Sequence, residues 1–279
     1  MFLSDFLVIV RGGGDLGTGV AHRLVHSGFT VMVTELAQPQ CVRRAVSFAE
    51  AVYAGQITVE DVTAHLADDP MLGMAYCVLG QVPVIVDAAE DVIEKMRPAV
   101  VVDARLAKRN LGTRLEDAPL VIGLGPGFTT GQDCHAVVET NRGHNLGRVY
   151  WEGGAEPDTG QPEPVRGMAG QRVLRAPAEG EFIGHRAIGD IVQPGELLAM
   201  VGDQPLLAPF AGVVRGLLHD RVPVTAGMKV GDLDPRGVRE YCFLISDKAR
   251  SVGGGVLEAI LAGMPLWHPA ADLERGDSA

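Results

Sequence analysis

Leu7-Val8-Ile9-Val10-Arg11-Gly12-Gly13-Gly14-Asp15-Leu16-Gly17 is the stretch of this sequence that decides the expected fold. A short apolar run leads directly into a G-x-G-x-x-G turn, the pattern of a strand followed by a helix. In that pattern Gly12 permits the tight turn, Gly14 lets a ligand approach the backbone, and Gly17 lets helix and strand pack closely. The free amides and the dipole of the first helical turn favour an anion. The cofactor-binding residues predicted from this turn are Gly12, Gly13, Gly14, Asp15, Leu16 and Gly17.

The residues around the turn support a nucleotide-binding interpretation, with one exception. Val20 and Leu24 continue an apolar helical stripe, and residues 29–35 follow as a second strand that ends at Glu35. In dinucleotide-binding folds a carboxylate at that position accepts a hydrogen bond from a ribose 2′-hydroxyl. Asp15 argues against a diphosphate, because like charges at about 4 Å cost about 4 kcal/mol at an effective dielectric of 20. Asp15 must then point away, hold a metal or face another ligand, and a plain tight turn is the alternative.

Apolar strands and helices alternate along residues 1–151, which we interpret as a Rossmann-like nucleotide- or cofactor-binding domain. Continuous apolar strands separated by helices indicate a parallel sheet covered on both faces. The predicted fold class is therefore α/β, with a doubly wound parallel sheet whose ligands bind beyond the carboxyl ends of the strands. Within this domain the pattern predicts helices over residues 40–54 and 60–67. At the other end of the chain it predicts a C-terminal helix over residues 247–270 and a disordered tail over residues 271–279.

The composition changes in the second half of the chain. Residues 152–170 are rich in glycine and proline and predict a linker, whereas residues 171–246 alternate short strands and turns. A weak internal repeat relates residues 192–198 to residues 224–230. This β-rich domain resembles the flattened barrel of biotinyl and lipoyl carrier domains. The hairpin between its two halves has no lysine at the tip, so we expect neither biotin nor lipoate.

The overall charge limits the class of partner. The chain has 279 residues and a formal net charge of −11, which leaves no basic face for nucleic acid and predicts repulsion from an anionic membrane. The apolar stretches are of strand length and too short to span a bilayer. The N-terminus carries Asp5 and no basic segment, so we expect no signal peptide and a cytoplasmic protein. The sequence allows a homo-oligomer without specifying one.

The four cysteines predict reduced thiols. They are scattered along the chain, and no C-x-x-C or Cys/His metal spacing occurs, so we expect no metal site and no disulfide framework. A buried, reduced thiol is the usual state in a cytoplasmic protein. A reactive thiol that carries sulfur or selenium is the alternative, with Cys134 and Cys77 as the candidates.

A basic cluster follows another predicted strand. Arg105 and Arg109 are four residues apart and would share one face of a helix. Such a pair suits bidentate contacts with phosphate or carboxylate, although a solvated helix start explains the same pattern. The cofactor-binding residues predicted here are Asp103, Arg105, Lys108 and Arg109.

Two further turns carry residues of interest. Three glycines in a turn after an apolar strand permit positive φ and close backbone approach, which fits a loop over a ligand or an ordinary sharp turn. The loop over residues 139–147 is dense in polar side chains, among which Glu139 and His144 are candidate catalytic acids or bases. A polar hairpin is the alternative for this loop. The glycines predicted to bind a cofactor are Gly123, Gly125 and Gly127.

Several stretches together resemble one protein family. They are RGGGDLGTGVAHRL, RRAVSFAEAVYAG, DARLAKRN, GLGPGF, VETNRGHNLGRVYWEG and ISDKARSVGGGVLEAIL. These segments are similar to the accessory proteins of selenium-dependent molybdenum hydroxylases, kin of the xanthine dehydrogenase accessory factors. The resemblance covers most of the chain and implies a Rossmann-like domain that handles the molybdenum cofactor. It carries over no catalytic residue.

The resemblance implies a role in enzyme maturation. The protein would hold a molybdopterin-type cofactor, or assist insertion of a selenium ligand, and would dock a client molybdenum hydroxylase. The first glycine turn, Glu35 and the basic cluster would contact this small anionic cofactor. One alternative is an oxidoreductase that binds NAD(P), favouring NAD, at the same turn with Glu139 or His144 as proton donor. Another is a non-enzymatic scaffold with a vestigial nucleotide site.

Overall fold

A nine-stranded sheet is the largest feature of the computed structural model, which describes residues 2–88, 91–158, 160, 167 and 170–268. Its strands are β1 Leu7–Arg11, β2 Thr30–Glu35, β3 Gln56–Val59, β4 Val62–Ala67, β5 Val82–Val86, β6 Val100–Asp103, β7 Leu120–Leu124, β8 Ala136–Val138 and β9 Val149–Tyr150. Their order is β3-β4-β5-β2-β1-β6-β7-β8-β9. The strands from β4 to β8 pair in parallel, whereas β3 is antiparallel to β4 and β9 is antiparallel to β8.

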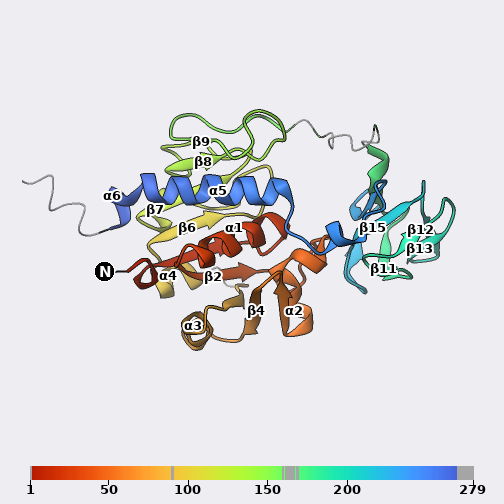
Figure 1. The fold of residues 1–279 in the computed structure, drawn as a ribbon, viewed down its shortest axis with the longest axis horizontal. Helices are drawn as coiled ribbons and strands as arrows, with labels where there is room; N and C mark the ends of the chain where they lie inside the picture. The colour runs from red at the N-terminus through yellow and green to blue at the C-terminus, as the bar shows by residue number, and fades with distance from the viewer. Residues whose placement is uncertain (1, 89–90, 159, 161–166, 168–169, 269–279) are drawn as a thin grey trace, which may run out of the picture.

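Helices cover both faces of this sheet (Figure 1). They are α1 Asp15–His26, α2 Ala51–Ala54, α3 Pro70–Val78, α4 Val92–Met96, α5 Asp247–Ala262 and α6 Met264–Trp267. Side chains alternate along β1, so Val8 and Val10 face the core beneath α1 and α5, while Ile9 faces the core that α3 and α4 cover. Helices α1 and α5 lie side by side, although almost the whole chain separates them in sequence (Figure 1).

Helices α1 and α5 begin where the local sequence favours a helix start. Helix α1 starts directly after Gly14 and buries Leu16, Val20 and Leu24, the apolar stripe that the spacing predicts. Helix α5 starts after Ser246, whose side chain accepts a hydrogen bond from the amide of Ala249 at 3.1 Å. Where one helix was predicted over residues 247–270, the structure has α5 and the short separate helix α6, and residues 269–270 lie outside the described part of the chain.

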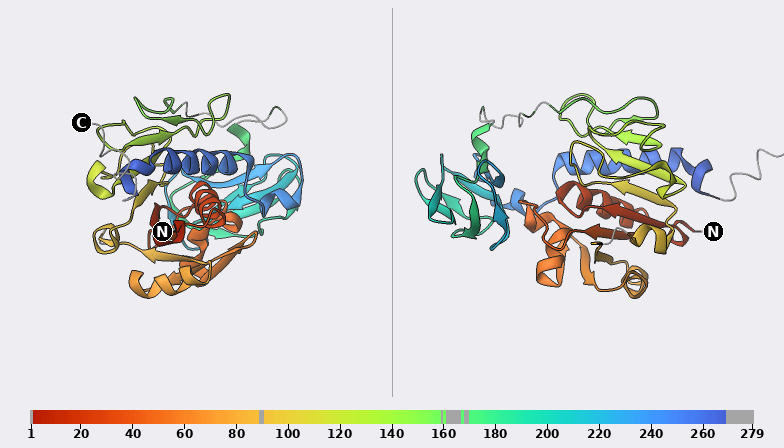
Figure 2. Two further views of the ribbon diagram at one scale, coloured as in Figure 1. Left: turned by 60° about the vertical axis from the view of Figure 1, so that its left-hand side comes forward. Right: turned by 180° about the vertical axis from the view of Figure 1, so that it is seen from behind.

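The second half of the chain forms two smaller antiparallel sheets. Their strands are β10 Val173–Arg175, β11 Gly180–Gly184, β12 Ile191–Val192, β13 Leu197–Val201, β14 Gln204–Leu207, β15 Gly212–Leu217, β16 Pro223–Val224 and β17 Lys229–Asp234. The sheet orders are β10-β17-β15-β12 and β14-β13-β11-β16, and a shared core includes Phe182, Leu198 and Leu233. Figures 1 and 2 show these sheets beyond the end of the large sheet at which α1 begins.

The predicted fold class is wrong in both halves. A Rossmann-like doubly wound parallel sheet was expected, but the sheet is mixed, with an antiparallel strand at each edge. The hairpin of β3 and β4 creates one of these edges, and residues 60–67, expected as a helix, supply β4. The biotinyl or lipoyl type of barrel is replaced by two separate four-stranded sheets, because β11 pairs with β13 and β16 while β15 pairs with β12 and β17.

The helix expected over residues 40–54 is also mostly absent. Two 3₁₀ turns, η2 Arg44–Val46 and η3 Phe48–Glu50, precede α2. Distant atoms take the amide hydrogens that a helix would use: Phe48 N donates to Thr18 Oγ1 at 2.8 Å and Ala49 N donates to Gly13 O at 2.9 Å. The remaining 3₁₀ turns are η1 Leu3–Asp5, η4 Leu115–Asp117, η5 Gly170–Arg172 and η6 Arg239–Cys242.

The predicted tail over residues 271–279 and much of the predicted linker lie outside the described residues, so the domain boundaries stay predictions. Among the residues that the structure describes, no helix has both the length and the apolar character to cross a membrane.

Candidate functional site

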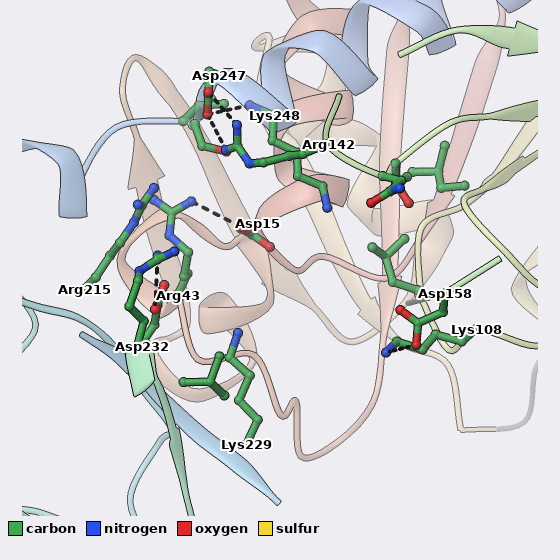
Figure 3. A pocket seen from close by; sticks show the side chains of 18 of the residues that line it. Asp15, Arg43, Lys108, Arg142, Asp158, Arg215, Lys229, Asp232, Asp247 and Lys248 are labelled. Carbon is green, nitrogen blue, oxygen red and sulfur yellow. Dashed lines mark hydrogen bonds and ion pairs between the residues drawn. The ribbon is translucent and has the colours of Figure 1, made fainter. Parts of the chain in front are cut away.

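A cavity of about 780 Å³ lies between the large sheet and the antiparallel sheets (Figure 3). Its wall includes Asp15 in the first turn of α1, the loops after β6 and β7, and residues 140–142 and 156–158. Strands β15 and β17 and residues 241–248 complete it. Sites beyond the carboxyl ends of parallel strands are the usual ligand positions in α/β sheets, so the location agrees with the expected one.

The lining is more cationic than the rest of this acidic chain. Eight lysine or arginine side chains reach it, against five carboxylates. The cations come from segments far apart in sequence, and the chain as a whole carries a net charge of −11. A local excess of positive charge in an acidic protein favours a small anion at this place. The cations are Arg43, Lys108, Arg142, Arg172, Arg215, Lys229, Arg236 and Lys248.

Arg43 and Arg215 are deeply placed, with side chains about 9% and 11% exposed, and Arg172 is as buried as Arg215. Figure 3 shows both on the same side of the cavity. Arg43 Nη1 donates to Asp15 Oδ2 at 3.2 Å, and its Nη2 donates to the backbone carbonyls of Tyr241 and Leu244. Burial, together with the nearby charge of Arg43, lowers the pKa of Arg215. Each guanidinium keeps a buried Nε–H for which the described residues provide no acceptor.

A buried carboxylate holds Arg215 of β15 and Arg236 of the turn after β17 in place. Asp234 accepts from Arg215 Nη1 at 3.1 Å and from Arg236 Nη2 at 2.6 Å. Burial alone would raise the pKa of Asp234, but the hydrogen bonds and charges of Arg236 and Arg215 outweigh it and lower the pKa to about 2. The carboxylate therefore stays ionised at neutral pH and fixes the direction of both guanidiniums.

Lys229 opens β17 at the rim of the cavity. Its side chain is exposed and forms no ion pair with any described residue. Nearby, Lys108 is bound to Asp158 at 2.6 Å and Arg172 to Asp232 at 3.4 Å. Lys229 is thus a cation that can turn toward a bound anion without breaking a contact.

The first glycine turn has the predicted shape but is filled by the chain itself. Gly12 has φ +97°, and a Cβ on Gly17 would run into the carbonyl oxygen of Gly12, so both glycines serve the turn as expected. Gly13 N donates to Glu35 Oε2 at 2.8 Å, and Gly13 O accepts from Ala49. Only at Gly14 is the space open, since an added Cβ there would meet nothing within 4 Å.

The sequence raised the question of how Asp15 could lie in a turn that binds an anion, and the contacts of Glu35 and Asp15 answer it. Glu35 accepts from the amides of Gly13 and Leu36, both at 2.8 Å, so its carboxylate serves the backbone and is not free for a ribose. Burial raises the pKa of Glu35, although these two hydrogen bonds act in the opposite direction. Asp15 faces the cavity and pairs with Arg43, which offsets its charge. Leu16 is buried in the core.

The basic cluster is dispersed in the structure. Residues 104–109 form no helix, so Arg105 and Arg109 do not share a helix face. Asp103 is buried and accepts from Arg105 Nη2 at 2.6 Å, which makes this pair an internal clamp. Lys108 lines the cavity, whereas Arg109 is exposed and outside it.

The second glycine turn is packed against the chain's own atoms. Added Cβ atoms would meet the ring of Phe128 at Gly123, the side chain of Thr140 at Gly125 and the backbone of Arg109 at Gly127. These glycines allow other atoms to approach the backbone closely, but the atoms that do so belong to the protein itself and not to a ligand. Only their neighbours Leu124 and Pro126 reach the cavity.

The candidate acids and bases lie apart from the cavity. Glu139 is fully buried and accepts from the amides of Asn141 at 2.7 Å and Glu156 at 2.8 Å. It therefore ties together two loops that line the cavity. His144 is exposed and does not reach the lining. Asn141 and Arg142, from the same loop, do reach it.

The thiols offer little reactivity. Burial is the largest cause that raises the pKa of Cys77 to about 11 and of Cys134 to about 12. Because the thiolate is the nucleophile, a raised pKa argues against these cysteines as carriers of sulfur or selenium.

Sequence reasoning missed the two central arginines. Arg43 lies in a segment that was expected to be an ordinary helix. Arg215 interrupts the apolar run of β15, and a lone cation in a buried strand is a local signal that marks such a residue. Nothing in the spacing of Arg43, Arg215 and Lys229 indicates that they meet.

No protein-family model matches this chain. The chain is 49% identical over 262 residues to an uncharacterized protein, YqeB, of Escherichia coli K12, an alignment that covers 94% of this chain and 48% of YqeB. The chain therefore spans about half the length of the curated relative it matches.

Three solved structures show a weak likeness. An aspartoacylase family protein of Mesorhizobium loti is 11% identical with a TM-score of 0.26, over 82% of this chain and 84% of the other. The ectoine utilization protein EutE of Ruegeria pomeroyi, product-bound, is 13% identical with a TM-score of 0.24 and the same coverage. A succinylglutamate desuccinylase/aspartoacylase of Rhodobacter sphaeroides is 14% identical, also with a TM-score of 0.24 and the same coverage. Likeness at this level assigns no activity to the chain.

The predicted identity and function are corrected. The similar proteins are an uncharacterized protein and structures named as aspartoacylase, desuccinylase or ectoine utilization proteins, and none of them is named as a maturation factor of molybdenum hydroxylases. The membership in that accessory family, the maturation role and the client hydroxylase are therefore wrong. The alternatives of an oxidoreductase and of a vestigial nucleotide scaffold lose the ribose contact on which they depended, because the carboxylate of Glu35 accepts from the amide of Gly13. A molybdopterin-type cofactor or NAD(P) as bound molecule remains an untested prediction.

Proposed function

We propose that the protein binds a small polyanion, a molecule with phosphate or carboxylate groups, in the cavity between its two halves. The observation that carries the proposal is the pair of buried guanidiniums, Arg43 and Arg215, each with an Nε–H that lacks an acceptor among the described residues. A buried donor left unsatisfied costs about 1–3 kcal/mol, and more when the group is charged. Oxygen atoms of an anion would remove that cost.

The size and surroundings of the cavity support a small molecule. About 780 Å³ falls within the range of roughly 300–1,000 Å³ that small-molecule sites occupy. The N-terminus of α1 adds a positive dipole end at the same wall. Asp15 does not repel an anion there strongly, because Arg43 already neutralises it at 3.2 Å.

Two classes of small polyanion could bind in the cavity, and both would use the same contacts with arginine. A nucleotide-bearing cofactor, of the molybdopterin or NAD(P) type, offers a diphosphate. A metabolite with two or more carboxylates offers the same bidentate geometry to arginine.

We also propose a cytoplasmic location, which the four cysteines without a disulfide partner support.

The test uses defined probes with the purified chain: pyrophosphate, NAD and citrate, each titrated by calorimetry. We expect at least one of them to bind and to raise the melting temperature. Lys229→Met and Arg215→Met should each weaken that probe roughly tenfold or more, the effect of losing one charge-assisted hydrogen bond. Lys95→Met is the matched control, because Lys95 lies on α4 outside the cavity.

The outcomes separate cleanly. Preference for pyrophosphate or NAD favours a nucleotide-type ligand, and preference for citrate favours a carboxylate metabolite. Equal affinity in Lys229→Met and Lys95→Met, or no binding of any probe at millimolar concentration, would contradict the proposal. Circular dichroism of each variant checks that it is folded, so that a loss of binding is not caused by unfolding.

A further inference from the structure

A second cluster of functional side chains lies outside the cavity, where α1 meets the hairpin turn between β3 and β4. His22 and His26 are one helical turn apart on α1 and present their imidazoles to the same side. Both Nε2 atoms approach the carboxylate of Asp61 in that turn, at 2.9 Å from His22 and 3.1 Å from His26. The ring centroids of the two histidines are 4.5 Å apart.

We propose that His22, His26 and Asp61 form a binding site for a divalent metal ion of the zinc class. Two imidazole nitrogens and one carboxylate oxygen are ligands that Zn²⁺ prefers, with a fourth position left for water or another molecule. One ligand atom from each residue lies within 4.8 Å of the others. A tetrahedral ion with bonds of about 2.0–2.1 Å separates its ligands by roughly 3.3 Å, so the three groups need only small shifts to enclose it.

A second carboxylate lies beside the cluster. Glu60 Oε2 is 3.7 Å from His22 Nε2, and Arg250 pairs with Glu60 and offsets its charge. Glu60 is held by the amide of Ile245 at 2.9 Å and by Arg250 Nη2 at 2.8 Å. It faces the ring nitrogen of His22 that would bind the ion, and the three proposed ligands remain His22, His26 and Asp61.

The position of the cluster explains why the sequence did not reveal it. The cysteines of the chain form no C-x-x-C or Cys/His metal spacing, and the sequence therefore predicted no metal site. His22 and His26 form an H-x-x-x-H spacing on a helix, but the third ligand comes from a hairpin that was expected to be part of another helix. The site exists only because β3 and β4 place their turn beside α1.

A purely structural role for the three groups is the competing explanation. Hydrogen bonds from two histidines to one aspartate also tie the hairpin to the helix. The two roles respond differently to Asp61→Asn. An asparagine oxygen still accepts a hydrogen bond from histidine, but it is a neutral and weaker metal ligand. The link would survive this change, and the metal affinity would not.

The test measures Zn²⁺ binding to the full chain after removal of metals with EDTA, by competition with a chromophoric chelator. We expect one tight equivalent in the wild type and affinity at least roughly tenfold weaker in His26→Ala and in Asp61→Asn. His144→Ala, which removes an exposed histidine elsewhere, is the control and should bind as the wild type does. Co²⁺ in place of zinc should give the visible absorption of a tetrahedral ion in the wild type and in His144→Ala, but not in His26→Ala or Asp61→Asn.

His26 is about half exposed, so its removal leaves no buried void, and circular dichroism should show a folded variant. Zinc affinity that is equal in wild type, His26→Ala and Asp61→Asn would overturn the proposal. An absence of any zinc binding to the wild type would do so as well. Neither outcome bears on the cavity, because the anion probes are titrated without metal.

Discussion

Glu35 shows how a residue can match a motif and yet serve another purpose. It stands at the end of β2, where an acid would contact a ribose, but its carboxylate is engaged by the amides of Gly13 and Leu36. The first of those amides belongs to the glycine turn itself. The acid thus satisfies a backbone donor that a diphosphate would otherwise accept from.

Replacement of Glu35 by glutamine tests this role. Burial raises the pKa of Glu35 above its ordinary value of 4.5, so the folded protein holds the proton to higher pH than the unfolded chain does. The free energy of unfolding therefore decreases as pH rises from about 4.5 through the folded pKa. Glu35→Gln removes the charge but keeps only one acceptor oxygen for the two amides of Gly13 and Leu36, so we expect it to lose less stability at pH 7 than Glu35→Ala does.

Denaturant unfolding of both proteins between pH 4 and pH 8 measures the effect. Glu35→Ala is the comparison, because it leaves the amide of Gly13 without its acceptor and should lose about 1–3 kcal/mol. A Glu35→Gln protein as unstable as Glu35→Ala would show that the charge itself is required.

At the level of elements, the contact between α1 and α5 depends on glycine. A Cβ on Gly19 of α1 would lie 2.7 Å from the Cβ of Ala249, and one on Gly253 of α5 would lie 2.8 Å from Gly19 O. A Cβ on Gly255 would run into the carbonyl oxygen of Gly147. Three successive glycines lower the helix propensity of α5, and close packing explains two of them.

The three glycines of α5 give a matched set of variants. Gly253→Ala and Gly255→Ala force a methyl group against backbone, so each should destabilise the protein by about 1–3 kcal/mol. Gly254→Ala meets no atom within 4 Å and should stabilise it by about 0.5–1 kcal/mol through helix propensity. Thermal and denaturant unfolding measure the differences. Equal effects at all three positions would contradict the packing explanation.

At the level of the whole molecule, the cavity depends on how the antiparallel sheets pack against the half of the chain that contains the large sheet. Arg44 joins the two halves: its Nε donates to Leu217 O of β15 at 2.8 Å, and its Nη1 pairs with Glu50 at 2.9 Å. The backbone of Val42 also lies against Gly216, where an added Cβ would be 2.7 Å from Val42 O. Arg43 lies between Val42 and Arg44 in the sequence, so these contacts also place Arg43 near Arg215.

Arg44→Ala tests whether this seat matters for binding. Arg44 does not line the cavity, yet we expect its loss to weaken the anion probe several-fold, because Arg43 and Arg215 lose their fixed spacing. Calorimetry with the probe that binds the wild type gives the affinity. Arg114→Ala, an exposed arginine outside the cavity, should leave it unchanged. An Arg44→Ala protein with wild-type affinity would show that the two halves hold their positions without this link.

Local patterns predicted the elements whose cause is local. The run from Leu7, the glycine turn and the apolar stripe of α1 lie within a few residues of one another, and the structure has that strand, turn and helix. The start of α5 after Ser246 has the same kind of cause. The 3₁₀ turns of residues 44–50 were not predicted, because their conformation is set by tertiary hydrogen bonds to Thr18 and Gly13.

The spacing of apolar residues and glycines was enough to specify the β1–α1 unit and the C-terminal helix, since propensity and capping act over one or two turns. The mixed sheet, the pair of antiparallel sheets and the candidate sites were not accessible in that way. Arg43, Arg215 and Lys229 meet only when two halves of the chain pack together, and His22 meets Asp61 only across a hairpin. Charges act through space, so which charges become neighbours is set by packing and not by order along the chain.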